Sequence, residues 1–168
     1  MKKIKIYSKK HGCFEVLVDD EDYPLVSQHK WYVTIQSRDR IYAITYIKKE
    51  NGKYTGLRMH RLIMSPDKNE DIDHINHNCL DNRKANLRKC TRSQNSQNSL
   101  SHTGTSIFKG VSWHKYVGRW QATIVPSGSI KKHLGYFSNE IDAAKVYDKK
   151  ALELFGEFAL TNKMMGLY

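Results

Sequence analysis

A long polar stretch in the middle of the sequence limits the cores that this chain can build. Residues 71–95 read DIDHINHNCLDNRKANLRKCTRSQN and contain few large apolar side chains. Residues 93–107, SQNSQNSLSHTGTSI, continue in Ser, Asn and Thr. A chain of 168 residues can form one ordinary domain or two small ones. The polar stretch favours two domains with modest cores, a boundary near residue 100 and a linker over residues 101–106.

Residues 4–63 are predicted to be rich in β-strands. The runs KIKIYS, CFEVLV, KWYVTI and RIYAITYI are β-branched and aromatic, and Asn51-Gly52 is a typical hairpin turn. The acidic run at residues 19–22 either binds a cation or begins a turn or short helix before Tyr23-Pro24, and we favour the turn. This strand-rich part belongs to a predicted domain over residues 1–100.

The C-terminal part predicts a small sheet and one helix. The runs FKGVSWHK, GRWQATIV and KKHLGYF indicate three short strands with glycine-containing turns. Asn139 or Ser138 can cap a helix that ends at Gly156. Helical spacing predicts its buried side chains to be Ile141, Ala144, Tyr147 or Asp148, Ala151, Leu152 and Phe155. We therefore expect an α+β protein with a second domain over residues 107–168.

The formal charge of +11 and the pI near 9.5 predict a polyanionic partner, with nucleic acid ahead of an anionic membrane surface. The sequence contains no run of about 18 apolar residues, so it predicts no helix that spans a membrane. The basic N-terminus lacks the apolar segment of a secretory signal. Cys13, Cys79 and Cys90 are scattered without a CxxC pair, which argues against disulfides and a cysteine zinc site. We expect a cytoplasmic protein.

Residues 73–95 contain the side chains that hydrolysis of a phosphodiester requires. A histidine such as His74 can deprotonate water, and a hard divalent cation on oxygen ligands can stabilise the leaving oxygen. Asp73 and an asparagine carbonyl are suitable ligands. If residues 71–74 end a strand, Asp73 and His74 project to opposite sides of it. Residues 86–91 are expected to form the returning strand. Thr91 or Ser93 can then cap a helix that carries Asn95 and Asn98. A plain polar loop remains the alternative.

The segment DHINHNCLDNRKANLRKCTRSQN resembles the core of HNH homing endonucleases, above all the phage intron-encoded nicking branch. MHRLIM, and VDDEDY followed by KWY, match this family further upstream. The resemblance implies a ββα-metal (His-Me finger) module with its core at about residues 58–99. It implies His74 as general base, Asp73 and Asn95 as ligands of one Mg²⁺ or Mn²⁺ ion, and Asn86 as the residue that orients the loop. Asn95 stands where other members have His, as in the HNN variant.

The remaining histidines carry weaker signals. We expect His60 to pack or hydrogen-bond beneath the site, with a direct role at the site as the alternative. His77 lies in the predicted loop, where it faces solvent or contacts phosphate.

The predicted C-terminal sheet has a polar face. Strand alternation places Ser112, His114 and Tyr116 together, and Arg119, Gln121 and Thr123 outward, with Lys131 and His133 on the third strand. Such a face can enter the DNA major groove, although a solvated sheet face would have the same pattern.

The segments FKGVSWHKYVGRWQATI, HLGYF and DAAKVYDKKALELFGEFALTN resemble the AP2 DNA-binding domain of plant transcription factors and some homing endonucleases. The resemblance implies DNA contacts at Lys109, Ser112, His114, Tyr116, Arg119, Thr123, Lys131 and His133. Plant members carry several arginines on this face where this chain has Ser, His, Thr and Lys. The recognised sequence therefore cannot be carried over, and much of the affinity is expected to come from phosphates.

Together these features predict a site-specific DNA endonuclease of the homing type that nicks one strand of double-stranded DNA as a monomer. We expect no membrane partner and no small-molecule cofactor beside the metal ion, and a gene carried by a phage in a bacterial host. The alternatives are a non-catalytic AP2-type DNA-binding regulator and a dimeric HNH restriction endonuclease that makes double-strand breaks.

Overall fold

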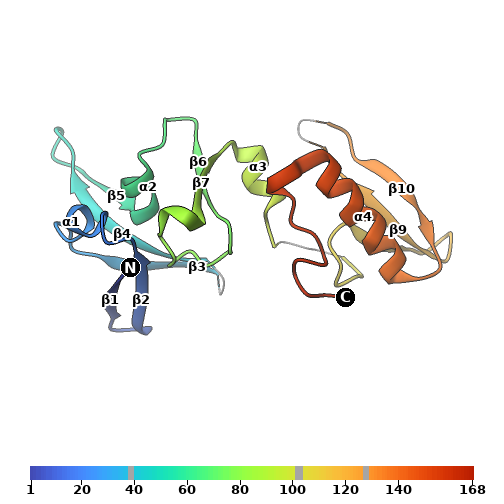
Figure 1. Cartoon of the computed structure of the whole chain (residues 1–168), viewed down its shortest axis with the longest axis horizontal. Coiled ribbons are helices and arrows are strands. Elements are labelled where there is room, and N and C mark those ends of the chain that lie inside the picture. Colours follow the sequence, from blue (N-terminus) through green and yellow to red (C-terminus); the bar gives the residue numbers. More distant parts are fainter. Residues whose placement is uncertain (38–39, 101–103, 127–128) are drawn as a thin grey trace. The chain divides into compact units, whose positions relative to one another are not determined.

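The computed structural model describes residues 1–37, 40–100, 104–126 and 129–168 (Figure 1). The chain divides into two compact units, a first unit over Met1–Thr91 and a second unit over Arg92–Tyr168. Both units combine helices with small antiparallel sheets, so the predicted α+β class is confirmed. The predicted linker at 101–106 begins with three residues outside the described ranges. The predicted domain boundary near residue 100 stays a prediction.

The first unit is built from short strands that pair antiparallel. β1 pairs with β2. A separate three-stranded sheet has the order β3-β4-β5, and β6 pairs with β7. The strands are β1 (Lys2–Ser8), β2 (Gly12–Val18), β3 (Tyr32–Ser37), β4 (Arg40–Lys48), β5 (Tyr54–Arg58), β6 (Asp71–His74) and β7 (Leu87–Cys90). The helices are α1 (Tyr23–Val26), α2 (Met59–Met64) and the 3₁₀ helix η1 (Lys84–Asn86).

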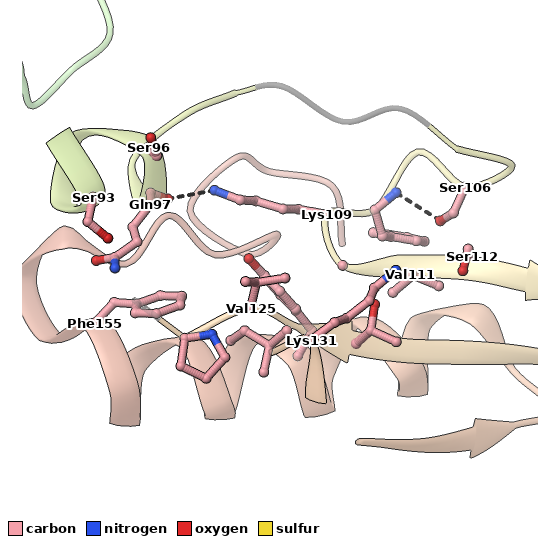
Figure 2. Close-up of a pocket in the computed structure, with 16 residues that line it drawn as sticks. Ser93, Ser96, Gln97, Ser106, Lys109, Val111, Ser112, Val125, Lys131 and Phe155 are labelled. Atoms are coloured by element: carbon pink, nitrogen blue, oxygen red, sulfur yellow. Dashed lines mark hydrogen bonds between the residues drawn. The ribbon is translucent and has the colours of Figure 1, made fainter. Parts of the chain in front are cut away.

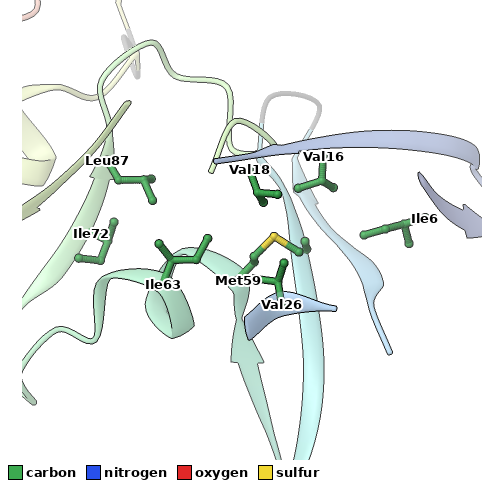
Figure 3. Close-up of a cluster of buried hydrophobic side chains, with 9 residues drawn as sticks. Ile6, Val16, Val18, Val26, Met59, Ile63, Ile72 and Leu87 are labelled. Carbon is green, nitrogen blue, oxygen red and sulfur yellow. The ribbon is translucent and has the colours of Figure 1, made fainter. Parts of the chain in front are cut away.

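One apolar cluster joins these elements (Figure 3). Met59 on α2 is fully buried at its centre, among residues from β2, α1, β6 and β7. The buried members are Ile6, Val16, Val18, Val26, Ala43, Met59, Ile63, Ile72 and Leu87. Helix α2 is the largest departure from the strand-rich prediction for residues 4–63. Its MHRLIM sequence places Met59 and Ile63 one helical turn apart, so that both enter this core.

The acidic run at residues 19–22 begins a short helix, as the turn interpretation predicted, and it also anchors η1. Helix α1 starts at Tyr23 directly after Asp22. The Lys84 backbone N–H donates to Asp19 Oδ2 at 2.8 Å. The Lys84 ammonium lies 2.6 Å from Glu21 Oε1 and 3.0 Å from Asp22 Oδ1. These bonds tie the loop before β7 to the chain after β2.

The second unit packs one long helix on a three-stranded antiparallel sheet of order β10-β9-β8. Its elements are α3 (Arg92–Gln97), β8 (Val111–His114), β9 (Arg119–Ile124), β10 (Lys132–Phe137), α4 (Glu140–Phe155) and the 3₁₀ helix η2 (Gly156–Phe158). None of the helices within the described ranges is long and apolar enough to cross a membrane.

Helix α4 has the predicted ends, and the predicted residues Ala144, Tyr147, Asp148 and Ala151 are buried. The Asn139 side chain accepts from the backbone N–H groups of Ile141 and Asp142 at 2.8 and 3.3 Å, and Gly156 follows the last turn. The predictions of burial for Ile141 and Leu152 are wrong, because they are 39% and 48% exposed. The buried residues are Ala143, Ala144, Tyr147, Asp148 and Ala151. Small alanines let α4 lie close to the sheet, so the larger apolar side chains remain outside.

Two contacts fix the ends of this unit. Gly110 has a φ of +77°, and a Cβ added there would lie 2.0 Å from Cδ2 of the buried Tyr147 ring. Asp148 Oδ1 accepts from the backbone N–H and side-chain amide of Asn162, both at 2.8 Å. Asn162 in turn accepts from the Lys109 backbone N–H at 2.6 Å. The C-terminal segment is therefore tied both to α4 and to the chain before β8.

Candidate active site and nucleic-acid interface

Asp73 and His74 occupy the last two positions of β6, where the sequence analysis expected a strand to end. Both are buried, at 6% and 5% exposure. In the antiparallel register Asp73 is opposite Arg88 and His74 is opposite Leu87. Arg88 Nε and Nη2 donate to Asp73 Oδ2 at 2.9 and 2.7 Å. A buried carboxylate is thus held by charge-assisted hydrogen bonds from the neighbouring strand.

Asn86 holds together the two ends of the loop between β6 and β7. Its side-chain oxygen accepts from the Asn76 backbone N–H at 2.9 Å. Its side-chain nitrogen donates to the Asp81 carbonyl at 2.8 Å, and its own carbonyl accepts from Ile75 N–H at 2.9 Å. Asn86 is buried, so these bonds are shielded from water. This geometry is what a loop-orienting residue requires.

The same loop extends the β1–β2 hairpin. Leu17 N–H donates to the Leu80 carbonyl at 2.9 Å, and Asn82 N–H donates to the Leu17 carbonyl at 2.8 Å. Asp81 binds Arg83 through two hydrogen bonds of 2.7 and 2.6 Å. The Arg83 guanidinium lowers the pKa of Asp81, which therefore remains a carboxylate. A loop with few apolar side chains is fixed by polar contacts on both sides.

His74 lies in an aromatic and basic environment. Its ring is 5.0 Å from the His60 ring in an edge-on arrangement, and Tyr42 lies 5.6 Å from His60 and 6.2 Å from His74. The Arg58 guanidinium lies 4.3 Å above the Tyr42 ring. His60 therefore packs beneath the site, as expected. Tyr42 and Arg58 were missed, because on their strands they have the pattern of ordinary surface side chains.

Burial sets the protonation of both histidines. Removal from water lowers the pKa of His74 to about 4 and that of His60 to about 2. Interactions with Asn82 and the carboxylates of Asp73 and Asp81 partly oppose this for His74 by raising its pKa. Both imidazoles are neutral at pH 7, so His74 is in the form that accepts a proton.

His77 lies inside this loop in an unusual backbone conformation. Its φ is +63°, in the left-handed region, and its backbone N–H donates to the His74 carbonyl at 3.0 Å. This turn lets the chain leave β6 sharply. His77 thus has a defined backbone position, and its predicted exposure to solvent or phosphate stays a prediction.

The donor types at this site fit a hard divalent cation. Among the described residues there is no cluster of three or more His, Cys, Asp or Glu side chains that would form a closed metal cage. One buried carboxylate, Asp73, with an asparagine carbonyl matches an ion such as Mg²⁺, which keeps several waters and needs few protein ligands.

Asn95, the second predicted ligand, lies on α3 in the second unit and is partly buried. Asn98 follows that helix and is buried. The role of Asn95 as a metal ligand stays a prediction.

The second unit has a polar sheet face opposite α4. Pairing across the strands places Ser112 opposite Gln121, and His114 opposite Arg119. Gln121 is also opposite Tyr136, and Thr123 is opposite His133. On the other side of the sheet, Val111, Ala122 and Ile124 are buried, so the predicted alternation is present. The predicted residues Ser112, His114, Arg119 and His133 therefore share one face, and Tyr116 lies in the exposed turn between β8 and β9.

Lys109 is not on this face. Its ammonium donates to the Gln97 carbonyl at 2.6 Å (Figure 2). It also donates to the Ser99 carbonyl at 2.9 Å. Burial lowers the pKa of Lys109 to about 8. In this structure the side chain fixes the end of α3 to the chain before β8, and its predicted DNA contact would require breaking those bonds.

Thr123 was predicted to point outward, but it is only 8% exposed. It lines a cavity of about 500 Å³ between α3, the sheet and the end of α4, together with Lys109 and Lys131. Its backbone N–H donates to the Gly110 carbonyl at 2.8 Å, so the chain before β8 lies beside it. Lys131 is exposed just before β10.

Tyr136 belongs to the polar face but was not predicted. Its ring lies 5.2 Å from the His114 ring and 4.4 Å from the His133 ring. Gln121 was predicted to point outward but was not proposed to contact DNA. Its Nε2 lies 3.0 Å from His133 Nδ1. Strand alternation alone identifies such residues as outward-facing and does not show that they cluster.

Comparison with known proteins gives two distinct similarities. An HNH endonuclease family model matches residues 64–97. An uncharacterised HNH endonuclease of Acanthamoeba polyphaga mimivirus is 34% identical over 159 residues, covering 91% of this chain and 76% of the viral protein. No solved structure matches this chain significantly.

The second similarity is to plant proteins. Two AP2-like ethylene-responsive transcription factors of Arabidopsis thaliana are 34% identical over 100 residues and 42% identical over 66 residues. These alignments cover 59% and 39% of this chain but only 19% and 11% of the plant proteins, so the likeness to AP2 proteins is partial.

The family model covers Asp73, His74 and Asn86, whose geometry is described above, and the viral relative extends the similarity over most of the chain. HNH nucleases generally use a divalent metal, and the donor types present here are compatible with one. The chain belongs to the HNH endonuclease family.

Proposed function

We propose that this protein is a site-specific DNA endonuclease of the homing type. The first unit provides Asp73, His74 and Asn86, and the polar face of the second unit binds double-stranded DNA. The observation that carries the proposal is the pair at the end of β6. Asp73 is oriented by Arg88, and the adjacent His74 is buried and neutral.

In this proposal His74 removes a proton from the water that attacks the scissile phosphate. Asp73 and Asn95 hold one Mg²⁺ or Mn²⁺ ion, which when bound supplies positive charge to the phosphate and the leaving oxygen. Arg88 keeps the Asp73 carboxylate in a fixed orientation. Asn86 fixes the loop that follows His74, so that the histidine ring is positioned before substrate arrives.

The neutral state of His74 supports its proposed role. A histidine that is protonated at pH 7 would have to lose a proton before it could accept one. Burial against His60 and Tyr42 removes that step. His60 has the lower pKa of the two, and its ring packs beside His74, so we assign it a supporting role.

We further propose that the ββα-metal arrangement consists of β6, β7 and α3, and that the AP2-like module consists of β8, β9, β10 and α4. The order of strands and helix in each part and the two sequence similarities support this assignment. The net charge of +11 supports a DNA partner, because phosphate neutralisation by Lys and Arg dominates non-specific affinity. We propose a monomer that nicks one strand, encoded by a phage and acting in the bacterial cytoplasm.

The test is cleavage of a supercoiled plasmid library with a randomised insert, in the presence of Mg²⁺ or Mn²⁺. The native protein is expected to give relaxed circles, and sequencing of the nicked molecules would identify the target. His74→Ala is expected to lose at least about a thousandfold in rate, as expected when a general base is removed. His11→Ala is the matched control, because His11 lies in the exposed turn between β1 and β2.

The other outcomes separate the alternatives. Linear product from the native protein would indicate a dimeric enzyme that cuts both strands. Specific DNA binding without any metal-dependent product would indicate a non-catalytic regulator. Equal activity of His74→Ala and the native protein would remove His74 from the mechanism.

A further inference from the structure

Gln121 occupies the centre of the polar sheet face. β9 is the middle strand of the β10-β9-β8 sheet, and Gln121 is paired with Ser112 on one side and Tyr136 on the other. Arg119, on the same strand and the same face, is exposed. A face with one central amide and a cation nearby suits a β-sheet that enters the major groove of DNA.

The Gln121 amide is held in place before any DNA is bound. Its Nε2 lies 3.0 Å from His133 Nδ1. The His133 ring packs against Tyr136 at 4.4 Å, and Tyr136 contacts His114 at 5.2 Å. These neighbours restrict the rotation of a side chain that would otherwise lose substantial conformational entropy on binding.

The orientation of the amide determines which base it can recognise. When His133 Nδ1 accepts a hydrogen bond from Gln121 Nε2, the amide still has a second N–H and its oxygen Oε1. One donor and one acceptor side by side match adenine, which presents N7 as acceptor and N6 as donor in the major groove. No other base presents that pair on a single edge.

We propose that Gln121 recognises an adenine in the major groove, and that His133 is the positioning residue that holds its amide. This inference rests on the proposed function, because it requires the sheet face to bind DNA. It adds a specific residue and a specific base to that function.

The experiment selects bound sites from a random duplex DNA library with the full-length protein, in the presence of Ca²⁺ in place of Mg²⁺. The native protein is expected to select adenine at one position. Gln121→Glu is expected to change that preference to cytosine, whose N4 amine donates to a carboxylate. Gln121→Ala is expected to lose about 5- to 150-fold in discrimination at that position only.

Two further variants separate recognition from folding. Gln36→Glu makes the same charge change at an exposed position of β3 and is expected to keep the native preference. His133→Phe keeps a ring against Tyr136 but removes the hydrogen-bond partner. It is expected to weaken the adenine preference without changing which base is preferred, because the Gln121 amide remains but is no longer held by His133 Nδ1.

The outcomes are distinct. If the native protein selects a site but the Gln121 variants retain every base preference, the assignment of Gln121 is overturned and DNA binding stands. If the native protein selects no sequence and binds no duplex, the proposed function of the sheet face fails, and this inference fails with it.

Discussion

The candidate active site of the first unit and the polar sheet face of the second unit place their side chains in opposite surroundings. In the first unit Asp73, His74 and Asn86 are buried, and they are held by a network of hydrogen bonds to an irregular loop. In the second unit Arg119 and His133 lie exposed on a regular sheet, where the pairing of strands determines their neighbours.

This difference has consequences for both stability and chemistry. Burial lowers the pKa of His74 and keeps its ring neutral. A protonated ring at this position would destabilise the folded protein. Substitutions in the first site are therefore expected to change stability and activity together. Substitutions on the sheet face are expected to change DNA affinity while the fold remains intact, because exposed positions contribute little to the core.

The largest effect is expected outside both functional sites, at Gly110 in the second unit. Gly110→Ala would place an alanine at a φ of +77°, which strains the backbone, and would direct its Cβ into the Tyr147 ring. Both effects destabilise the second unit. We expect a loss of at least about 3 kcal/mol in the free energy of unfolding of this unit. Hydrogen–deuterium exchange over residues 108–124, compared with residues 59–90, would locate the loss.

Gly118→Ala separates the two causes. Gly118 also has a positive φ, of +66°, but no atom lies within 4 Å of the position of an added Cβ. It should cost only about 1 kcal/mol from backbone strain. Equal costs at Gly110 and Gly118 would show that the Tyr147 contact is unimportant.

In the first unit, Asn86→Ala is expected to lower the free energy of unfolding by about 2–3 kcal/mol. It would leave the Asn76 N–H and the Asp81 carbonyl without their partners. Asn86→Asp is the matched variant, because it keeps the acceptor for Asn76 and loses only the donor to Asp81. Denaturant unfolding and plasmid nicking should both rank the native protein above Asn86→Asp and Asn86→Ala. Loss of stability without loss of nicking would separate loop order from catalysis.

Much of this arrangement could be predicted from the sequence where local patterns are strong. β6 and β7 lie within the predicted strands, and α4 begins after Asn139 and ends before Gly156, because caps and alternation are local signals. The packing of His60 beneath the site also agrees with the prediction. The predicted metal and DNA contacts stay predictions.

Other features depend on contacts distant in sequence. Lys109 was predicted on the DNA face, but its ammonium bonds to carbonyls ten and twelve residues earlier in the chain. Tyr42 lies next to His74 only because the β3-β4-β5 sheet packs beside the β6–β7 hairpin. Ile141 and Leu152 have helical spacing, but the close approach of α4 to β9 selects alanines for the buried face. No periodicity in one segment contains this information.

The pH dependence of stability tests the buried site. The pKa of His60 is lowered to about 2, from an ordinary value near 6.5, so the unfolded chain binds the proton and the folded chain does not. The contribution of neutral His60 to the free energy of unfolding is fully present above pH 6.5 and is lost as the pH falls. Between pH 7 and pH 5 the free energy of unfolding decreases by about 2 kcal/mol for this reason.

His60→Phe should remove that loss while keeping a ring against His74. Denaturant unfolding at pH 7 and pH 5 measures the difference for the native protein and the variant. Between pH 7 and pH 5 the free energy of unfolding of the variant is expected to decrease by about 2 kcal/mol less than that of the native protein. The decrease that remains is expected to come mainly from His74. Parallel slopes would mean that His60 is accessible to protons in the folded state.

The smallest effect is expected for Arg119→Ala, and it tests whether the exposed face contains two kinds of contact. Arg119 is exposed at the start of β9, and no hydrogen bond from its guanidinium to the described part of the protein fixes its orientation. A flexible cation of this kind suits phosphate rather than a base edge. Affinity should fall by about tenfold or less, equally for selected and random duplexes, and the slope of log affinity against log salt should decrease by about 1. Titrations at several salt concentrations measure both quantities. A loss confined to the selected duplex, with an unchanged salt slope, would instead place Arg119 beside Gln121 as a base-recognising residue.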